Sequence, residues 1–325
     1  MQGGKKSHVL HAAAIGSAFA CCAALVGGTA SAASAATSAA PQLLQVHTDG
    51  SIWGYPTAGS GGWTKIAAAG PNAQVVVGNH GSEIFRLETN GTVWGYTSTG
   101  GWNEVDSSPA NVKIATAGYG VMELHKDGTT WLAGTAAGGA PEELGNNGAT
   151  GIVTAGTSDY EISSNGAIRG MTYPGYWFTF DANPQAAGFA VDDDSPNAIF
   201  ELHTDGTVWQ YTGNWAKTGW KKIATHPGAV QIAAGPTVGS LYELDSNGQV
   251  QQYNEASGTW TVIGAFPSLG SLQVDDNGTL YAHVATGFFK GFIYQFVGPN
   301  TSWEVRDSNS QTASFAAGNT RDAAR

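Results

Sequence analysis

Three histidines are the first candidates for metal chemistry, because each lies three residues before the glycine of a repeated turn. They are His47, His125 and His203. Zinc binds imidazole nitrogen at about 2.1 Å, whereas equivalent positions in neighbouring sheets are separated by about 10 Å. A site made of these three histidines is therefore excluded by geometry, and we interpret each one as a polar residue that ends a strand.

A run of three carboxylates is the other candidate for a metal. Asp192, Asp193 and Asp194 could supply the hard oxygen ligands that Ca²⁺ takes. The chain has no Asp-x-Asp-x-Asp-Gly pattern around them, so a solvated loop is the favoured interpretation. We expect no metal, and these three residues are only weak candidates for one.

The motifs of familiar catalytic sites are absent. The sequence has no Gly-x-Ser-x-Gly elbow, no His-Glu-x-x-His zinc motif and no phosphate-binding loop. Acidic pairs such as Glu142-Glu143 occur, but nothing in the sequence places two carboxylates across a glycosidic bond. We expect no catalysis and no cofactor.

Eleven tryptophans form the largest chemically distinctive group. One set follows a turn glycine by three residues and is expected to fill the space between sheets: Trp53, Trp94, Trp131 and Trp209. A second set follows loops rich in Gly, Ser and Thr: Trp63, Trp102, Trp220, Trp260 and Trp303. An exposed ring there could stack on the apolar face of a pyranose. These five are the predicted sugar-binding residues, with packing at the rim as the alternative.

The elements that must position these residues are repeated hairpins. Phe200–Tyr211 contains two strands with alternating periodicity around Asp205-Gly206, which predicts a type I′ turn. Equivalent glycines, separated by 41, 37, 38, 40, 42 and 30 residues, are Gly50, Gly91, Gly128, Gly166, Gly206, Gly248 and Gly278. The sequence therefore predicts seven repeats.

Each repeat predicts four short antiparallel strands. A strand rich in Ala and Gly, such as Gln231–Gly235, precedes the hairpin, and the strand with the second tryptophan follows it. Four strands in about 40 residues indicate a blade of a β-propeller. Residues 313–318 look like an inner strand, whereas residues 43–46 look like a second strand. We expect an all-β, seven-bladed propeller whose ring is closed when the C-terminal strand completes the first blade.

The N-terminal segment has the pattern of a secretion signal. Lys5 and Lys6 precede an apolar run, and Ala30-Ser31-Ala32 is a cleavage pattern. We expect a signal peptide at residues 1–32, a small-residue linker at 33–41 and one propeller domain at 42–325. Both cysteines lie within the signal, and no other stretch could span a membrane. The predicted location is secreted and extracellular.

Charge argues against nucleic acid as a partner. The whole chain has 14 basic and 25 acidic residues, and two of the basic residues lie in the predicted signal. The mature chain therefore has a net charge of 12 − 25 = −13. An acidic surface repels phosphate backbones.

The repeat resembles the tachylectin-type and tectonin-like lectin propellers, and it is similar to the tachylectin-related modules of secreted actinobacterial proteins. The resemblance is carried by Phe200–Tyr211, Trp220 and Ile232–Gly235 and by their counterparts in other repeats. It implies a propeller that binds glycans, N-acetylated sugars among them. The chain departs from the five-bladed lectin in the number and length of its repeats.

These observations predict a secreted, multivalent, lectin-like propeller that binds glycans or cell-wall and extracellular polysaccharide. Several weak equivalent sites would give avidity. An extracellular protein–protein interaction scaffold is the alternative, and a propeller glycoside hydrolase is a third possibility with less support.

Overall fold

A computed structural model describes most of the chain after residue 40. The described residues are 41–56, 62–77, 84–97, 100–117, 120–134, 140–155, 158–173, 176–191, 199–213, 219–235, 241–275, 278–298 and 303–318. All of them belong to one compact unit, Ser38–Arg325. The predicted signal peptide, nearly all of the predicted linker and Asp192–Asp194 lie outside them. Within this part of the chain, no helix has the length and apolar character needed to cross a bilayer.

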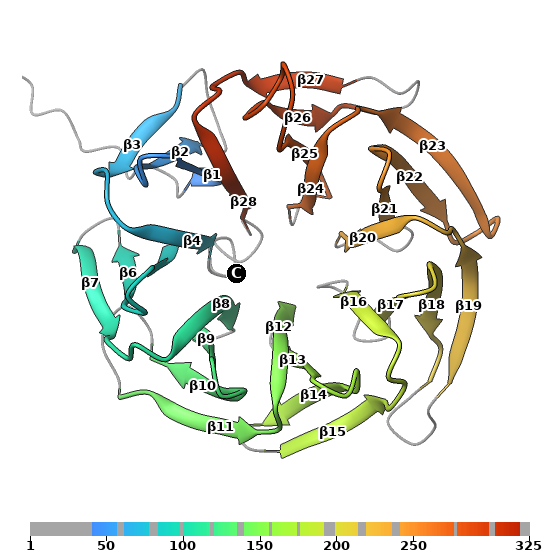
Figure 1. Cartoon of the computed structure of the whole chain (residues 1–325), viewed down its shortest axis with the longest axis horizontal. Helices are drawn as coiled ribbons and strands as arrows, with labels where there is room; N and C mark the ends of the chain where they lie inside the picture. Colours follow the sequence, from blue (N-terminus) through green and yellow to red (C-terminus); the bar gives the residue numbers. More distant parts are fainter. Residues whose placement is uncertain are drawn as a thin grey trace, which may run out of the picture. The chain divides into compact units, whose positions relative to one another are not determined.

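The described residues form seven sheets, each of four antiparallel strands, arranged around a ring (Figure 1). This confirms the predicted seven-bladed propeller. The first three blades consist of β28 (Thr312–Ala317), β1 (Pro41–His47), β2 (Ile52–Pro56) and β3 (Thr64–Ala67); β4 (Asn72–Val77), β5 (Ile84–Glu88), β6 (Val93–Thr97) and β7 (Gly101–Asp106); and β8 (Asn111–Ala117), β9 (Gly120–His125), β10 (Thr129–Ala133) and β11 (Glu142–Asn146).

The other four blades have the same strand order from the axis outward. They consist of β12 (Ala149–Ala155), β13 (Ser158–Ser163), β14 (Ile168–Tyr173) and β15 (Tyr176–Asp181); β16 (Ala186–Val191), β17 (Ile199–His203), β18 (Thr207–Tyr211) and β19 (Trp220–Thr225); β20 (Ala229–Ala234), β21 (Leu241–Asp245), β22 (Gln249–Asn254) and β23 (Thr259–Ala265); and β24 (Leu269–Val274), β25 (Leu280–Val284), β26 (Ile293–Phe296) and β27 (Trp303–Asp307).

The hairpin turn differs from the predicted type I′ turn. At Gly206 φ is 78°, but Asp205 is not among the described residues with positive φ. The Gly206 N–H donates to the carbonyl of His203 at 3.0 Å, and the Asp205 carboxylate accepts from the Thr207 N–H at 2.9 Å. This is the three-residue hairpin in which a type I turn is followed by a left-handed glycine. A Cβ on Gly206 would also collide with the His226 carbonyl of the connection to the next blade.

The seventh blade uses the same turn at a different place, which corrects the predicted repeat. Gly278, at φ 79°, follows β24 and precedes β25, and its N–H donates to the Asp275 carbonyl at 2.8 Å. The hairpin between β25 and β26 instead contains Gly291, at φ 87°. The interval from Gly248 to the equivalent glycine is therefore 43 residues, not 30, because the same local turn sequence occurs one connection earlier.

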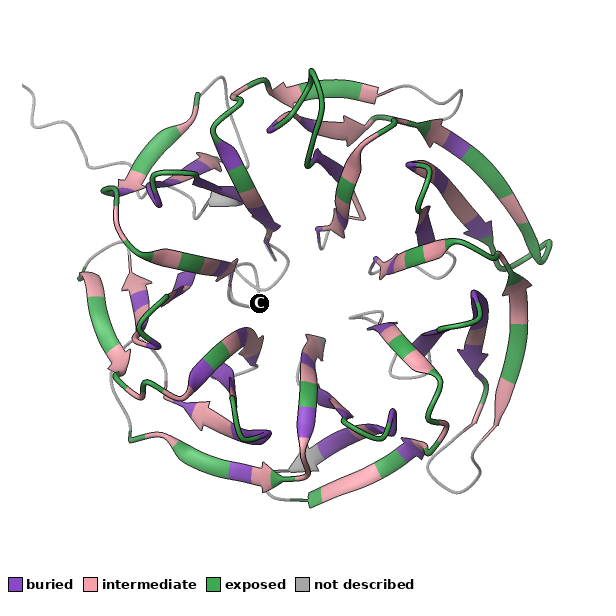
Figure 2. Cartoon of the chain, viewed as in Figure 1, coloured by how far each residue is buried: buried purple, intermediate pink, exposed green. Residues whose placement is uncertain are grey.

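The apolar core lies between blades. Seven clusters of buried side chains are described, and each joins two neighbouring sheets. In one of them Leu44 and Ile52 of blade 1 meet Val75 and Ile84 of blade 2. Figure 2 shows the consequence, since buried residues concentrate on the second and third strands and exposed ones on the outermost strands. No blade can bury its apolar face without its neighbours.

The C-terminal strand closes the ring, as predicted. β28 pairs antiparallel with β1, with Leu43 opposite Ala317 and Gln45 opposite Phe315. The side-chain amide of Gln273 in β24 bonds the Phe315 carbonyl at 2.8 Å and the Ala317 N–H at 2.7 Å. One segment thus completes blade 1 and fixes it to blade 7.

Deleting residues 311–325 is expected to unfold or aggregate the protein. The deletion exposes an edge of β1 and removes Phe315 from the junction with blade 7. Deleting only residues 319–325 leaves β28 whole and is the matched control. Size-exclusion chromatography and thermal unfolding measure the outcome, and a monomeric, fully stable 311–325 deletion would contradict ring closure.

Candidate functional site

The five predicted sugar-binding tryptophans lie at equivalent places in five different blades, so the structure does not bring them together. All five are half-buried: Trp63, Trp102, Trp220, Trp260 and Trp303. Each packs against an apolar cluster that joins its blade to the preceding one. Each also contacts a tyrosine or phenylalanine of its own third strand, as Trp220 contacts Tyr211 with ring centroids 5.3 Å apart.

Four of these five indoles are held by a hydrogen bond across the junction between blades. The indole of Trp177, which is not one of the five, is held in the same way. In each case Nε1 donates to a backbone carbonyl on the outer strand of the preceding blade. The pairs are Trp102 to Ile66 at 3.0 Å, Trp177 to Leu144 at 2.8 Å, Trp220 to Phe180 at 3.3 Å, Trp260 to Ile223 at 3.3 Å and Trp303 to Ile263 at 2.8 Å. Trp63 differs, because its buried Nε1 has no hydrogen-bond partner among the described residues. These indoles act as clamps between blades, and their sugar-binding role stays a prediction.

The other set of tryptophans makes polar and stacking contacts within its own repeat. Trp53, Trp94, Trp131 and Trp209 are half-buried and belong to none of the seven described inter-blade clusters. Trp131 stacks on His125 at 5.2 Å, and its Nε1 donates to the Thr129 hydroxyl at 2.9 Å. That hydroxyl donates to the Asp127 carboxylate at 2.8 Å. The same arrangement occurs around Trp53 and Trp209.

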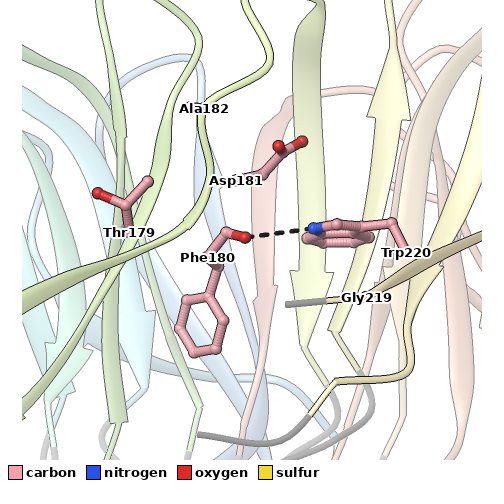
Figure 3. A pocket seen from close by; sticks show the side chains of 6 residues that line it. All are labelled: Thr179, Phe180, Asp181, Ala182, Gly219 and Trp220. Carbon is pink, nitrogen blue, oxygen red and sulfur yellow. Dashed lines mark hydrogen bonds between the residues drawn. The ribbon is translucent and has the colours of Figure 1, made fainter. Parts of the chain in front are cut away.

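One of the five predicted tryptophans lines a pocket. The pocket encloses about 340 Å³ between blades 4 and 5 and is lined by Thr179, Phe180, Asp181, Ala182, Gly219 and Trp220. Figure 3 shows the indole of Trp220 across from the end of β15, where Phe180 accepts its hydrogen bond and Asp181 follows. The volume lies near the lower limit of small-molecule sites, about 300–1,000 Å³. The pocket thus combines an aromatic ring, a hydroxyl and a carboxylate.

A buried glutamate occupies one repeated position in four of the seven blades. It stands two positions before the histidine position of the second strand: Glu123, Glu161, Glu201 and Glu243, with Gln45, Arg86 and Ala282 in the remaining blades. The four glutamates are at most 1% exposed. This position is not among the predicted site residues, although a carboxylate that recurs between apolar residues of a strand is a sequence signal for it.

Two of these glutamates face a basic side chain of the protein. Glu161 lies 3.8 Å from Arg169, and Glu243 lies 2.7 Å from Nδ1 of His226. Arg169 occupies the third-strand position that tryptophan fills in other blades. The guanidinium of Arg169 offsets part of the cost of burying Glu161. The ring of His226 gives Glu243 a hydrogen-bond partner.

The other two glutamates face a second carboxylate and a histidine. Asp106, Glu123 and His125 form one cluster at the junction of blades 2 and 3, and Asp181, Glu201 and His203 form the other at the junction of blades 4 and 5. Within each cluster one ligand-type atom per residue lies within 4.8 Å of the others. Burial and the neighbouring aspartate raise the pKa of Glu123 to about 8 and that of Glu201 to about 9. Burial lowers the pKa of both histidines.

Comparison with known proteins shows the fold only. The sequence matches no protein-family model and no curated protein. Among solved structures, "YCF48 bound to D1 peptide" is similar with a TM-score of 0.51 at 12% identity, over 73% of this chain and 80% of that one. Prp20p from Saccharomyces cerevisiae gives 0.51 at 12%, over 69% and 71%, and the C-terminal WD40 domain of Sif2 gives 0.52 at 13%, over 77% and 76%. These likenesses agree with the seven-bladed propeller and leave the resemblance to lectins as a prediction.

The indole hydrogen bond across the junction predicts that two equivalent tryptophans contribute differently to the free energy of unfolding. Trp260→Phe is expected to lose about 1 kcal/mol more unfolding free energy than Trp63→Phe, because only Trp260 gives up a hydrogen bond. Both variants lose a similar apolar contact, so Trp63→Phe is the matched control. Urea unfolding provides the measurement, and equal losses would show that the indole hydrogen bond does not contribute.

A buried aspartate away from these clusters predicts a pH dependence. Asp159 in β13 is 8% exposed, and desolvation raises its pKa from 3.8 to about 7. The unfolded chain therefore loses this proton at lower pH than the folded protein. The stability contribution of the neutral acid is complete below about pH 4 and is lost as pH rises through about 7.

Asp159→Asn should remove this loss of folding stability at high pH. The variant is expected to be more stable than the parent at pH 8, by up to about 4 kcal/mol for a shift of about three pKa units, and similar to it at pH 4. Asp205→Asn is the control of opposite sign, because hydrogen bonds from Thr207 lower the pKa of Asp205. Urea unfolding across this range measures both variants, and a pH-independent difference for Asp159→Asn would contradict the assignment.

Proposed function

We propose that this chain is a secreted carbohydrate-binding propeller whose principal site is the pocket between blades 4 and 5. The observation that carries the proposal is that this pocket joins Trp220 to Asp181. The resemblance of the repeat to lectin propellers and the predicted signal peptide support the same role. The proposal is for binding without catalysis.

The chemistry of the pocket suits one pyranose ring. The half-buried indole of Trp220 supplies an aromatic surface for the C–H face of a sugar, held in place by its bond to the Phe180 carbonyl. The exposed Thr179 and the half-buried Asp181 supply a hydroxyl and a carboxylate for the sugar hydroxyls. At Trp220 a stacking surface and polar groups thus occur together in one described pocket.

A protein-interaction scaffold is the second candidate function, and one surface feature favours it. The loop between β25 and β26 presents Phe288 at 93% exposure and Phe289 at 49%, and the two rings contact each other at 5.1 Å. This loop is longer than the equivalent hairpin turns and brings aromatic residues to the surface of blade 7. Exposed aromatic residues are enriched at protein–protein interfaces.

Binding of N-acetylated sugars and cell-wall polysaccharides, first on a glycan array and then by titration calorimetry, tests the proposal. Trp220→Ala is expected to weaken binding roughly tenfold or more, about 1.4 kcal/mol, because the stacking surface is lost. Asp181→Asn should weaken it through lost hydrogen bonds to sugar hydroxyls.

Trp260→Ala is the matched control. Trp260 has the same position and the same type of clamp one blade further on, but it does not line the described pocket. Its variant should retain the affinity of the parent. Equal losses for the two variants would assign binding to the repeated rim rather than to the pocket, and an array without any bound glycan would overturn the proposal.

A further inference from the structure

The two carboxylate–histidine clusters differ from the other blade junctions in their charge. At the junctions of blades 3 and 4 and of blades 5 and 6, the buried glutamate faces Arg169 or His226. At the junction of blades 7 and 1 the equivalent residue is neutral Gln45, which accepts a hydrogen bond from Thr312 at 2.6 Å. At the two clusters the facing residue is a second acid, Asp106 or Asp181. Among these five junctions, the buried residue at the repeated position faces a second acid at only two.

The buried oxygen atoms at these two places also lack donors. Neither carboxylate oxygen of Glu123 or of Glu201 receives a hydrogen bond from the described residues, and the two side chains are 0% and 1% exposed. Nε2 of His203 lies 3.2 Å from Oε1 of Glu201, but it too makes no hydrogen bond within the described chain. Burying polar atoms that have no hydrogen-bond partner is costly, and a metal ion is one group that can supply the missing interaction.

We propose that each of these clusters binds a zinc-type divalent cation that joins neighbouring blades. Asp106 of blade 2 would share one ion with Glu123 and His125 of blade 3, and Asp181 of blade 4 would share the other with Glu201 and His203 of blade 5. Two carboxylates, a neutral imidazole and a divalent ion sum to zero charge, which suits a buried junction.

The donor set selects the type of cation. Zinc accepts aspartate, glutamate and histidine together, with a water molecule or another ligand in the fourth tetrahedral position. Calcium takes six to eight oxygen ligands, so a set of three donors that includes a nitrogen does not suit it. Tetrahedral zinc separates its donors by about 3.3 Å. The ligand atoms of each cluster lie within 4.8 Å of one another, so side-chain movements of at most about 1.5 Å would bring them to that separation.

The protonation states agree with this site. Neutral histidine is the form that binds metal, and burial lowers the pKa of His125 and His203.

Zinc titration of the full chain, after removal of metals with EDTA, tests the proposal. We expect two tightly bound zinc ions per chain by elemental analysis after gel filtration. At zinc about 100-fold above the dissociation constant, the unfolding temperature should rise by about 5 °C per site, whereas calcium should have no such effect. Co²⁺ in place of zinc should give the visible absorption of tetrahedral coordination.

Conservative variants distinguish these sites from zinc on surface histidines. Glu123→Gln and Glu201→Gln should each remove one bound ion, and the double variant should remove both. Each variant should also leave the metal-free protein at least as stable as the parent, because a buried acid without donors is replaced by a neutral amide. Glu243→Gln is the control, since Glu243 already faces His226 and should leave two ions bound.

Two results would overturn the proposal: no zinc retained by the parent after gel filtration, or an unchanged zinc count in the double variant.

The Glu123 cluster lies at the junction of blades 2 and 3, away from the pocket that contains Asp181. The zinc count of Glu123→Gln is therefore independent of whether the protein binds glycans.

Discussion

The packing of one blade against the next is the interaction on which this structure depends. A four-stranded blade has two large faces, and the described apolar clusters all lie between neighbouring blades. The indole clamps near the rim and the Gln273 amide near the axis add hydrogen bonds across the same junctions. Stability is therefore a property of the closed ring, and the strand from the C-terminal end is as necessary as any other strand of blade 1.

The junctions also explain where chemistry can occur. Polar groups at a junction are removed from water, so each needs a partner. Arg169 pairs with Glu161 inside blade 4, and Thr312 bonds Gln45 inside blade 1. His226, in the connection between blades 5 and 6, contacts Glu243 of blade 6. The two acid–histidine clusters and the pocket beside Trp220 lie at junctions as well. Candidate recognition in this propeller therefore arises between blades rather than within a repeat.

Much of the fold could be predicted from the repeat, because the period, the turn glycines and the alternating strands are local patterns. The closure by residues 312–317 followed from counting strands. The seventh repeat was misplaced, since Gly278 forms the same turn one connection earlier. The clusters escaped prediction for another reason. His125 was compared with its equivalents in other blades, whereas its neighbour Asp106 occupies a different position of the preceding blade. Contacts between non-equivalent positions require the three-dimensional arrangement.

The central claim is that two blade junctions with an excess of buried carboxylate are completed by cations from solution. Anomalous diffraction at the zinc absorption edge, from crystals of the full chain grown with a small molar excess of zinc, tests it most directly. We predict one peak among Asp106, Glu123 and His125 and another among Asp181, Glu201 and His203. The account would be contradicted if neither site showed anomalous density and peaks appeared only at surface histidines.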